Sequence, residues 1–416
     1  MKLLLKNFFF GSLSLAILSC GGQSQEHSSR FTQKQVASLQ MGSTKILSAT
    51  NDSVETIDLN PFLKKRPFDF GEIIEEVRLI PLESTEEAFL TRIDQLKMTD
   101  SHIYIMDDKK GSRNNEVVIF DRKGRFIKRI PKGKGPGELS RAYKIEFDEV
   151  ANELIVDVHS YLKFFSPEGK FIRQWRYPFF FHGLTTLPDG NGYVFKSMDR
   201  EGNEHMGHLA DYLVKITDKD FHLNSVAMFA KPTEVIFHGN SYFHKNNGEL
   251  YVTDRFQDTV FQITSASEIK ARYVLDYNDN RLPQHYVYGK NEEFRKVRKR
   301  GEYAYYMGAY ADVGTHQFFR LTTEDRTALI FRDKSTGVLK GGNGRKGCVE
   351  VPNNWFFRQW TAGDYFVSYY TPMGAKPFPD SSIIPEEDKA RARNLEEGDN
   401  IVLVLYKLKR FEKEPT

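Results

Sequence analysis

The chain has 416 residues, which is enough for one large hydrophobic core or two ordinary ones, so length alone does not fix the number of domains. Its 59 Lys and Arg residues nearly balance 56 Asp and Glu residues, and the net charge of +3 gives no reason to expect a nucleic acid as partner. Aromatic residues make up 13% of the chain, many in short alternating runs such as HIYIMD and ELIVDV, which favours strands over helices. We therefore predict an all-β protein.

The first 20 residues have the pattern of an export signal, with Lys2 and Lys6 before an apolar run that is too short to span a bilayer comfortably. The run ends in ILSC, at residues 17–20, which resembles the lipobox of bacterial lipoproteins. That resemblance implies cleavage before Cys20, acylation of its sulfur, and a place in the bacterial cell envelope as an outer-membrane lipoprotein facing the periplasm or the surface. The alternative is a plain signal peptide that happens to contain a cysteine. An acylated Cys20 would leave Cys348 without a cysteine partner for an intramolecular disulfide bond.

Residues 21–53 are polar and rich in Ser, Gln and Thr, and they show no sustained apolar period. This composition predicts a flexible tether between the membrane and a folded domain. We place the folded domain at residues 54–410, followed by a short tail at 411–416.

The folded part contains an internal repeat. Residues 93–130 and 143–175 align almost strand for strand, and their turns DRKG and SPEG begin at Asp121 and Ser166, which are 45 residues apart. This spacing is typical of a propeller blade with four strands. Four looser copies follow, at residues 183–230, 241–276, 309–340 and 355–409.

The last copy is one strand short, and the run EVRLIPLE at residues 76–83 can supply the missing strand. Pairing the beginning of the chain with its last blade closes the ring and removes an exposed sheet edge. The sequence therefore predicts a six-bladed β-propeller of four-stranded antiparallel blades, closed by an N-terminal strand and carrying short helical insertions on one face.

The chain resembles the six-bladed β-propeller lipoproteins with NHL-like repeats over roughly residues 55–409. Four features carry the resemblance: VRLIPLEST before the first repeat, VVIFDRKGRFIKRIPKGKGPGE across its end, DTVFQI at residues 258–263, and the lipobox with its polar tether. The resemblance implies a fold and an exported address. It transfers no catalytic residues to this chain.

The glycine-rich run KGKGPGE at residues 132–138 raises the question of a phosphate-binding loop. Such a loop needs a helix directly after it, whose N-terminal N–H groups hold the phosphate. The following LSRAYKIEFD alternates like a strand, and Pro136 removes a backbone donor. We therefore predict that this run is the crossover between two blades.

Other polar residues give weak signals for chemistry. Asp107, Asp157 and Asp254 each end the second strand of a repeat, where a repeated Asp most often hydrogen-bonds the following turn, although such a trio can also suggest metal ligands or a general acid and base. His205 and His208 lie on a probable loop and are too few for a zinc site. There is no Gly-x-Ser-x-Gly or His-Glu-x-x-His motif. We expect no metal and no cofactor.

The two faces of the predicted ring differ in loop length. Long segments fall on the face that carries the second-to-third strand loops and the blade crossovers, at residues 131–141, 197–211, 278–308 and 372–400. Loops longer than about 15 residues are usually functional or disordered. We therefore expect a ligand site at this mouth of the channel, although the insertions could instead pack down and plug it. The candidate border residues are Arg141, Asp157, His182, His238, Arg255 and Asn354, and the candidate lid residues are Arg295, Arg298, Tyr303, Tyr305 and Tyr306.

The predicted function is that of a monomeric, lipid-anchored and non-catalytic module that binds a glycan, a peptide or an envelope protein through this face. The alternative is a propeller lyase or hydrolase that acts on an envelope or nutrient glycan or peptide. A propeller fold hosts both classes of function and does not separate them.

Overall fold

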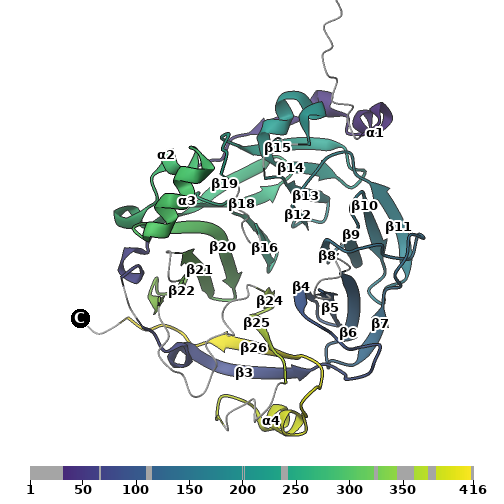
Figure 1. Ribbon diagram of the computed structural model, residues 1–416, viewed down its shortest axis with the longest axis vertical. Coiled ribbons are helices and arrows are strands. Elements are labelled where there is room, and N and C mark those ends of the chain that lie inside the picture. The colour runs from purple at the N-terminus through teal and green to yellow at the C-terminus, as the bar shows by residue number, and fades with distance from the viewer. Residues whose placement is uncertain are drawn as a thin grey trace, which may run out of the picture.

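The computed structural model describes residues 31–64, 67–108, 115–198, 200, 202–235, 242–322, 327–343, 360–372 and 381–413. Six antiparallel sheets are arranged in a ring around a central axis (Figure 1). The predicted six-bladed all-β propeller is therefore confirmed. Each blade runs from an inner strand at the axis to an outer strand at the rim.

The first three blades follow each other directly in the chain. Blade 1 comprises β4 (Ile93–Met98), β5 (His102–Asp107), β6 (Glu116–Asp121) and β7 (Phe126–Arg129). Blade 2 comprises β8 (Lys144–Asp148), β9 (Glu153–Asp157), β10 (Tyr161–Phe165) and β11 (Phe171–Arg176). Blade 3 comprises β12 (Gly183–Thr186), β13 (Gly192–Lys196), β14 (Tyr212–Asp218) and β15 (Leu223–Phe229).

The other three blades complete the ring. Blade 4 comprises β16 (Phe243–Asn246), β17 (Glu249–Val252), β18 (Thr259–Ser265) and β19 (Glu268–Asp276). Blade 5 comprises β20 (Tyr305–Val313), β21 (His316–Thr322), β22 (Thr327–Asp333) and β23 (Leu339–Gly342). Blade 6 comprises β24 (Trp360–Ala362), β25 (Tyr365–Tyr370), β26 (Val402–Leu408) and, as its outer strand, β3 (Ile74–Pro81).

The pairing of β3 with β26 closes the ring, as the sequence predicts. The two strands are antiparallel, with Val402 opposite Pro81 and Lys407 opposite Glu76. In Figure 1 the early strand β3 lies beside the late strand β26. The outer position of blade 6 is therefore filled by the beginning of the propeller domain.

The hydrophobic cores lie between neighbouring blades, and β5 shows why. Ile103 and Ile105 pack in the cluster shared with blade 6, whereas Tyr104 and Met106 pack in the cluster shared with blade 2. Successive side chains of a strand point to opposite faces of its sheet, and here both faces meet another blade. The central residues of β5 are therefore apolar without interruption.

The repeated turns have a common chemistry. In the turn after β6, the Asp121 carboxylate accepts hydrogen bonds from the backbone N–H groups of Lys123 (2.8 Å) and Arg125 (2.9 Å). Gly124 has a φ of +85°, and a Cβ atom there would lie 2.2 Å from the carbonyl oxygen of Pro81. The turn therefore needs glycine both for its conformation and for its close contact with β3.

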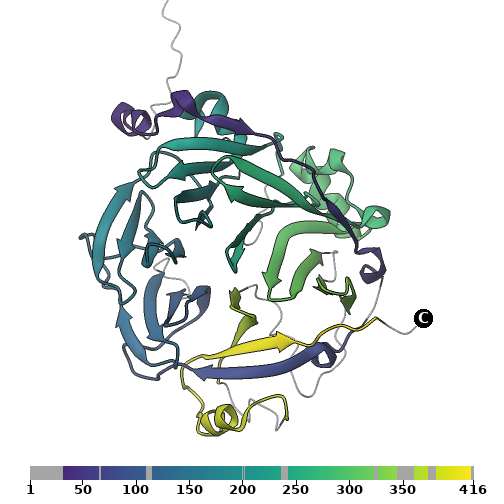
Figure 2. The same cartoon turned by 180° about the vertical axis from the view of Figure 1, so that it is seen from behind.

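Residues 31–53 differ from the predicted tether, because they are folded onto the propeller. They form α1 (Gln33–Ala37), η1 (Met41–Ser43) and β1 (Lys45–Leu47), and β1 adds to the edge of blade 3 in parallel with β15. The strand β2 (Glu55–Asp58) then adds to blade 4 in parallel with β19. Figure 2 shows this segment running along the outside of both blades, so blades 3 and 4 have five strands each.

Helical turns occupy the long loops. The segment between β2 and β3 contains η2 (Asn60–Phe62) and η3 (Phe70–Ile73), and the loop between β13 and β14 contains η4 (Glu204–Asp211). The blade 4 to blade 5 crossover contains η5 (Asn278–Asn280), α2 (Gln284–Val287) and α3 (Asn291–Arg300), and the β25–β26 loop contains α4 (Glu386–Arg393). By strand direction the insertions after β13, β19 and β25 share one face, as predicted. In both views, α2, α3 and α4 lie towards the rim, outside the inner strands.

Within the described ranges, no helix has the length and apolar character needed to cross a membrane.

Candidate ligand-binding site

The glycine-rich run at residues 132–138 is the crossover from β7 to β8, as predicted, and the chain enters β8 without a helix. The loop folds around the buried Lys163, whose amine donates to the carbonyl oxygens of Gly135 and Glu138, both at 2.6 Å. Its carbonyl groups therefore hold a cation of the protein, whereas a phosphate loop would present N–H groups to an anion.

The three strand-end aspartates have different partners. Asp107 accepts from the backbone N–H groups of Thr91 (2.8 Å) and Arg92 (3.1 Å), which belong to the preceding crossover. Asp254 pairs with Lys196 of blade 3 at 2.7 Å. Only Asp157, treated next, bonds the turn that follows its strand. Within the described part of the chain, no group of three or more His, Cys, Asp and Glu side chains could hold a metal ion.

Asp157 is a buried carboxylate at the mouth of blade 2. It accepts from the His159 backbone N–H (3.0 Å) and the Tyr177 hydroxyl (3.0 Å). Burial raises the pKa of Asp157 to about 6, and these two hydrogen bonds and Lys144 oppose that rise. Its bonding to the turn supports a structural role.

The predicted border residues fall into two groups. Arg141 stacks on the Tyr143 ring, 4.5 Å from its centroid, and Tyr143 donates its backbone N–H to the carbonyl oxygen of Asp157, so these residues cluster over blade 2. The His182 N–H donates to the carbonyl oxygen of Lys196 (2.7 Å), which places His182 with Arg255 over blades 3 and 4. His238 and Asn354 lie outside the described residues.

Only some of the predicted lid residues are exposed at the surface. The helix α3 is present, with Arg295 exposed, Arg298 half-buried, and Phe294 and Val297 buried beneath it. Tyr303 is half-buried against the same small core.

Tyr305 and Tyr306 differ from the expectation, because they belong to β20 and their side chains are buried. Tyr306 is fully enclosed in the cluster between blades 4 and 5. Tyr305 packs under α2 and α3. The expected lid tyrosines are therefore strand residues that support the insertion from below.

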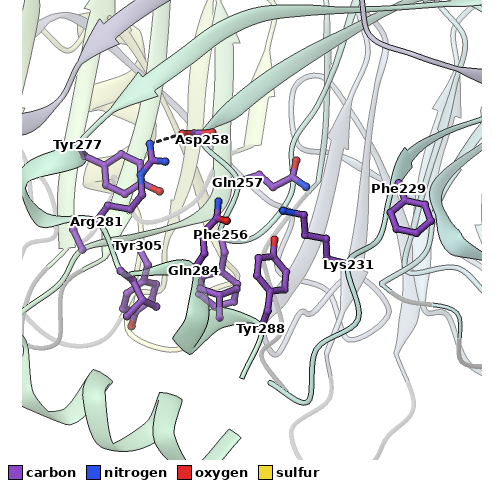
Figure 3. A pocket seen from close by; sticks show the side chains of 13 residues that line it. Phe229, Lys231, Phe256, Gln257, Asp258, Tyr277, Arg281, Gln284, Tyr288 and Tyr305 are labelled. Carbon is purple, nitrogen blue, oxygen red and sulfur yellow. Dashed lines mark hydrogen bonds and ion pairs between the residues drawn. The ribbon is translucent and has the colours of Figure 1, made fainter. Parts of the chain in front are cut away.

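A pocket lies on the long-loop face, between the edge of blade 3, the β17–β18 loop and the insertion with α2. Its cavity volume is about 200 Å³. Of the eleven predicted border and lid residues, nine lie within the described ranges, and among these only Tyr305 lines the pocket. The lining residues are Phe229, Lys231, Phe256, Gln257, Asp258, Tyr277, Arg281, Leu282, Gln284, Val287, Tyr288, Ala304 and Tyr305 (Figure 3).

Some polar groups of this pocket are paired with each other, and others have no partner among the described residues. Arg281 and Asp258 form an ion pair, and the Arg281 guanidinium also lies over the Tyr277 ring, 5.0 Å from its centroid. Lys231 places its amine 5.2 Å from the centroid of the Tyr288 ring, and in Figure 3 it points towards Gln257 and Tyr288. Within the described residues, the Lys231 amine and the amides of Gln257 and Gln284 form no hydrogen bond or ion pair.

The electrostatics beside the pocket are set by a second ion pair. The Lys196 amine is fully buried, pairs with Asp254, and lies 4.0 Å from the centroid of the Tyr242 ring. Burial raises the pKa of Tyr288, and the nearby Asp254 raises it further while Arg255 lowers it. The Tyr288 hydroxyl therefore stays protonated at neutral pH and can both donate and accept a hydrogen bond.

Most of these lining residues are not predicted from the sequence. The insertion at 278–308 stands out by its length. Its basic and aromatic second half favours a predicted site at residues 295–306, whereas the pocket is lined by Gln284 and Tyr288 of its first half. Gln257 lies in a short loop, so loop length gives no signal for it. Only the fold brings residues 229–231 beside residues 256–258 and 281–288.

Comparisons with known proteins agree with the fold. A solved structure described as a "Putative exported protein" from Bacteroides fragilis is similar at 14% sequence identity with a TM-score of 0.66, covering 86% of this chain and 100% of that one. A member of the duf4221 family from Bacteroides vulgatus is similar at 13% identity with a TM-score of 0.47, covering 81% and 97%. No curated protein matches the sequence. Residues 54–407 match the family described as "Domain of unknown function (DUF4934)", and the chain belongs to this family.

Proposed function

We propose that this protein is a non-catalytic binding module of the bacterial cell envelope and that it binds a glycan in the pocket over blades 3 and 4. The observation that carries the proposal is the placement, among aromatic walls, of the Lys231 amine and of the Gln257 and Gln284 amides, which have no hydrogen-bond partner among the described residues. Sugar hydroxyls both donate and accept hydrogen bonds. A glutamine amide can pair with them in both ways, because its NH₂ group donates and its carbonyl oxygen accepts. Pockets with apolar walls and a few convergent polar groups are the usual form of a small-ligand site.

The lining of the pocket supports binding over hydrolysis. Most glycosidases need two carboxyl groups on either side of the bond that breaks. Asp258 is the one carboxylate among the lining residues, and it is paired with Arg281. A propeller lyase or hydrolase remains the alternative, and turnover of a bound glycan by the purified protein would establish it.

The envelope location rests on the signal-like N-terminus and on the fold shared with the Bacteroides fragilis protein described as exported. Cys20 lies outside the described residues, and we propose that it carries the lipid anchor. Acyl chains hold a protein to a membrane firmly only when more than one signal is present. Changing Cys20→Ala should abolish palmitate labelling and release the protein from the membrane fraction, whereas labelling retained in this variant would overturn the anchor.

A glycan array probed with the full chain tests the binding function. We expect binding to a restricted set of glycans, weakened by Gln257→Ala and unchanged by Lys123→Ala, which alters an exposed residue in a turn of the opposite face. Binding of peptides with no response to any glycan would contradict the proposal. Equal loss of affinity in both variants would show that the wrong face had been chosen.

A further inference from the structure

We infer that the pocket selects a carboxylated sugar, with Lys231 pairing with the carboxylate and with Gln257 and Gln284 binding the ring hydroxyls. This deepens the proposed function and rests on it. The inference depends on the placement of one amine and two amides around a single aromatic pocket.

Lys231 is the group that would hold the carboxylate. Its side chain follows β15 at the end of blade 3, is exposed, and reaches across the pocket to the Tyr288 ring. A lysine amine above an aromatic face is weakly held, so it can turn to a stronger partner without breaking an ion pair. Among the described residues it has no carboxylate partner to give up.

The acidic lining residue Asp258 and the nearby Asp254 are both paired with cations of the protein. Asp258 is paired with Arg281, and Asp254 is paired with the buried amine of Lys196 at 2.7 Å. Lys231 therefore leaves the lining with an excess of one positive charge. An anionic ligand group gains from this charge, whereas a cationic group would meet repulsion.

The shape and the other polar groups favour a sugar acid over other anions. The cavity of about 200 Å³ is large enough for one sugar ring. Its amides offer both donors and acceptors, and phosphate, which mainly accepts hydrogen bonds, would use only the donors. Phosphate sites usually rely on bidentate arginine or on several backbone N–H groups. Here the lining arginine, Arg281, is occupied by Asp258.

An extended peptide fits this part of the molecule less well. Peptides commonly bind by adding a strand to a free sheet edge. The outer edges of blades 3 and 4, which flank the pocket, are already paired with β1 and β2.

Isothermal titration of the full chain with matched sugars tests the inference. The probes are the uronic acids of glucose, galactose and mannose, each compared with its neutral parent sugar, and inorganic phosphate and an acidic hexapeptide serve as other anions. We expect at least one uronic acid to bind about ten-fold more tightly than its parent, as one charge-assisted hydrogen bond allows. The Lys231→Met variant should lose this preference while keeping the affinity for the neutral sugar, and Lys123→Met should behave like the natural protein.

The possible outcomes distinguish a failure of carboxylate selection from a failure of glycan binding. If a neutral sugar binds as tightly as its acid, and Gln257→Ala weakens both, the protein is a glycan binder and the selection of a carboxylate is wrong. If phosphate or the peptide binds more tightly than every sugar, the inference and the glycan function both fail. An acid preference that survives in Lys231→Met assigns the charge to another residue and also overturns the inference.

Discussion

Leu39 tests whether the segment before the propeller is part of the fold. The side chain is completely buried in the cluster that also contains Tyr193, Phe195 and Val226 of blade 3. Changing Leu39→Ala removes three carbon atoms worth about 0.8 kcal/mol each, and the cavity left behind adds to that loss, so the free energy of unfolding should fall by about 3 kcal/mol. A flexible tether would give no such effect.

Urea unfolding followed by tryptophan fluorescence can measure this loss. Trp175 stacks on Phe221 in the same cluster with ring centroids 3.6 Å apart, so it reports on the packing around Leu39. The matched control is Ile46→Ala in β1, a residue that is 50% exposed and should cost less than about 1 kcal/mol. Equal midpoints for Leu39→Ala, Ile46→Ala and the natural protein would show that residues 31–53 are not packed in solution.

Three further predictions follow from the fold. Deleting residues 71–83 removes the outer strand of blade 6 and should abolish the single cooperative transition in calorimetry, so an unchanged transition would contradict the ring closure. Gly124→Ala should destabilise the protein by about 2 kcal/mol or more in urea unfolding, because the added Cβ meets a backbone carbonyl of β3, whereas Gly398→Ala, with a similar φ but open space around it, should cost about 1 kcal/mol. Burial lowers the pKa of His244 to about 4, below its unfolded value near 6.5, so the stability it contributes is complete above pH 6.5 and is lost as the pH falls through 4. Between these pH values the natural protein should lose about 3 kcal/mol more than a His244→Gln variant, and parallel pH profiles would refute this assignment.

The sequence predicts the ring because the blades repeat both their strands and their turns. Asp121 with Gly124 and Ser166 with Gly169 occupy equivalent turns, and each glycine has a positive φ. The run EVRLIPLE at residues 76–83 is also recognisable as a strand, because Val77 and Leu79 alternate with Glu76 and Arg78. These signals are local in the sequence, so they can be recognised without knowing which residues lie nearby in the fold.

The sequence does not predict the folding of residues 31–53 onto the blades. The strand β1 has only three residues and β2 only four, and each relies on an existing sheet edge for its hydrogen bonds. A pattern of that length gives no readable period. The burial of Leu39 comes from its neighbours in space, not from its neighbours in sequence.

The sequence predicts which face of the propeller carries the candidate site, but not which residues line it. Loop lengths indicate the correct side for the insertions, but Tyr305 and Tyr306 begin a nine-residue strand, β20, that starts earlier than the repeat suggests. The pocket combines residues from four separate segments, and those at 229–231 and 256–258 lie outside the long segments that the sequence singles out. Without the packing of blades 3 and 4, no pattern links Lys231 to Gln257.

Hydrogen exchange of the full chain, with and without the glycan that binds most tightly on the array, shows whether the ligand binds in the pocket over blades 3 and 4. We expect the bound glycan to slow exchange at residues 229–231, 256–258 and 281–288, which surround the pocket. Protection confined to the opposite turns at residues 122–124 and 167–169, with none at the pocket, would contradict this expectation.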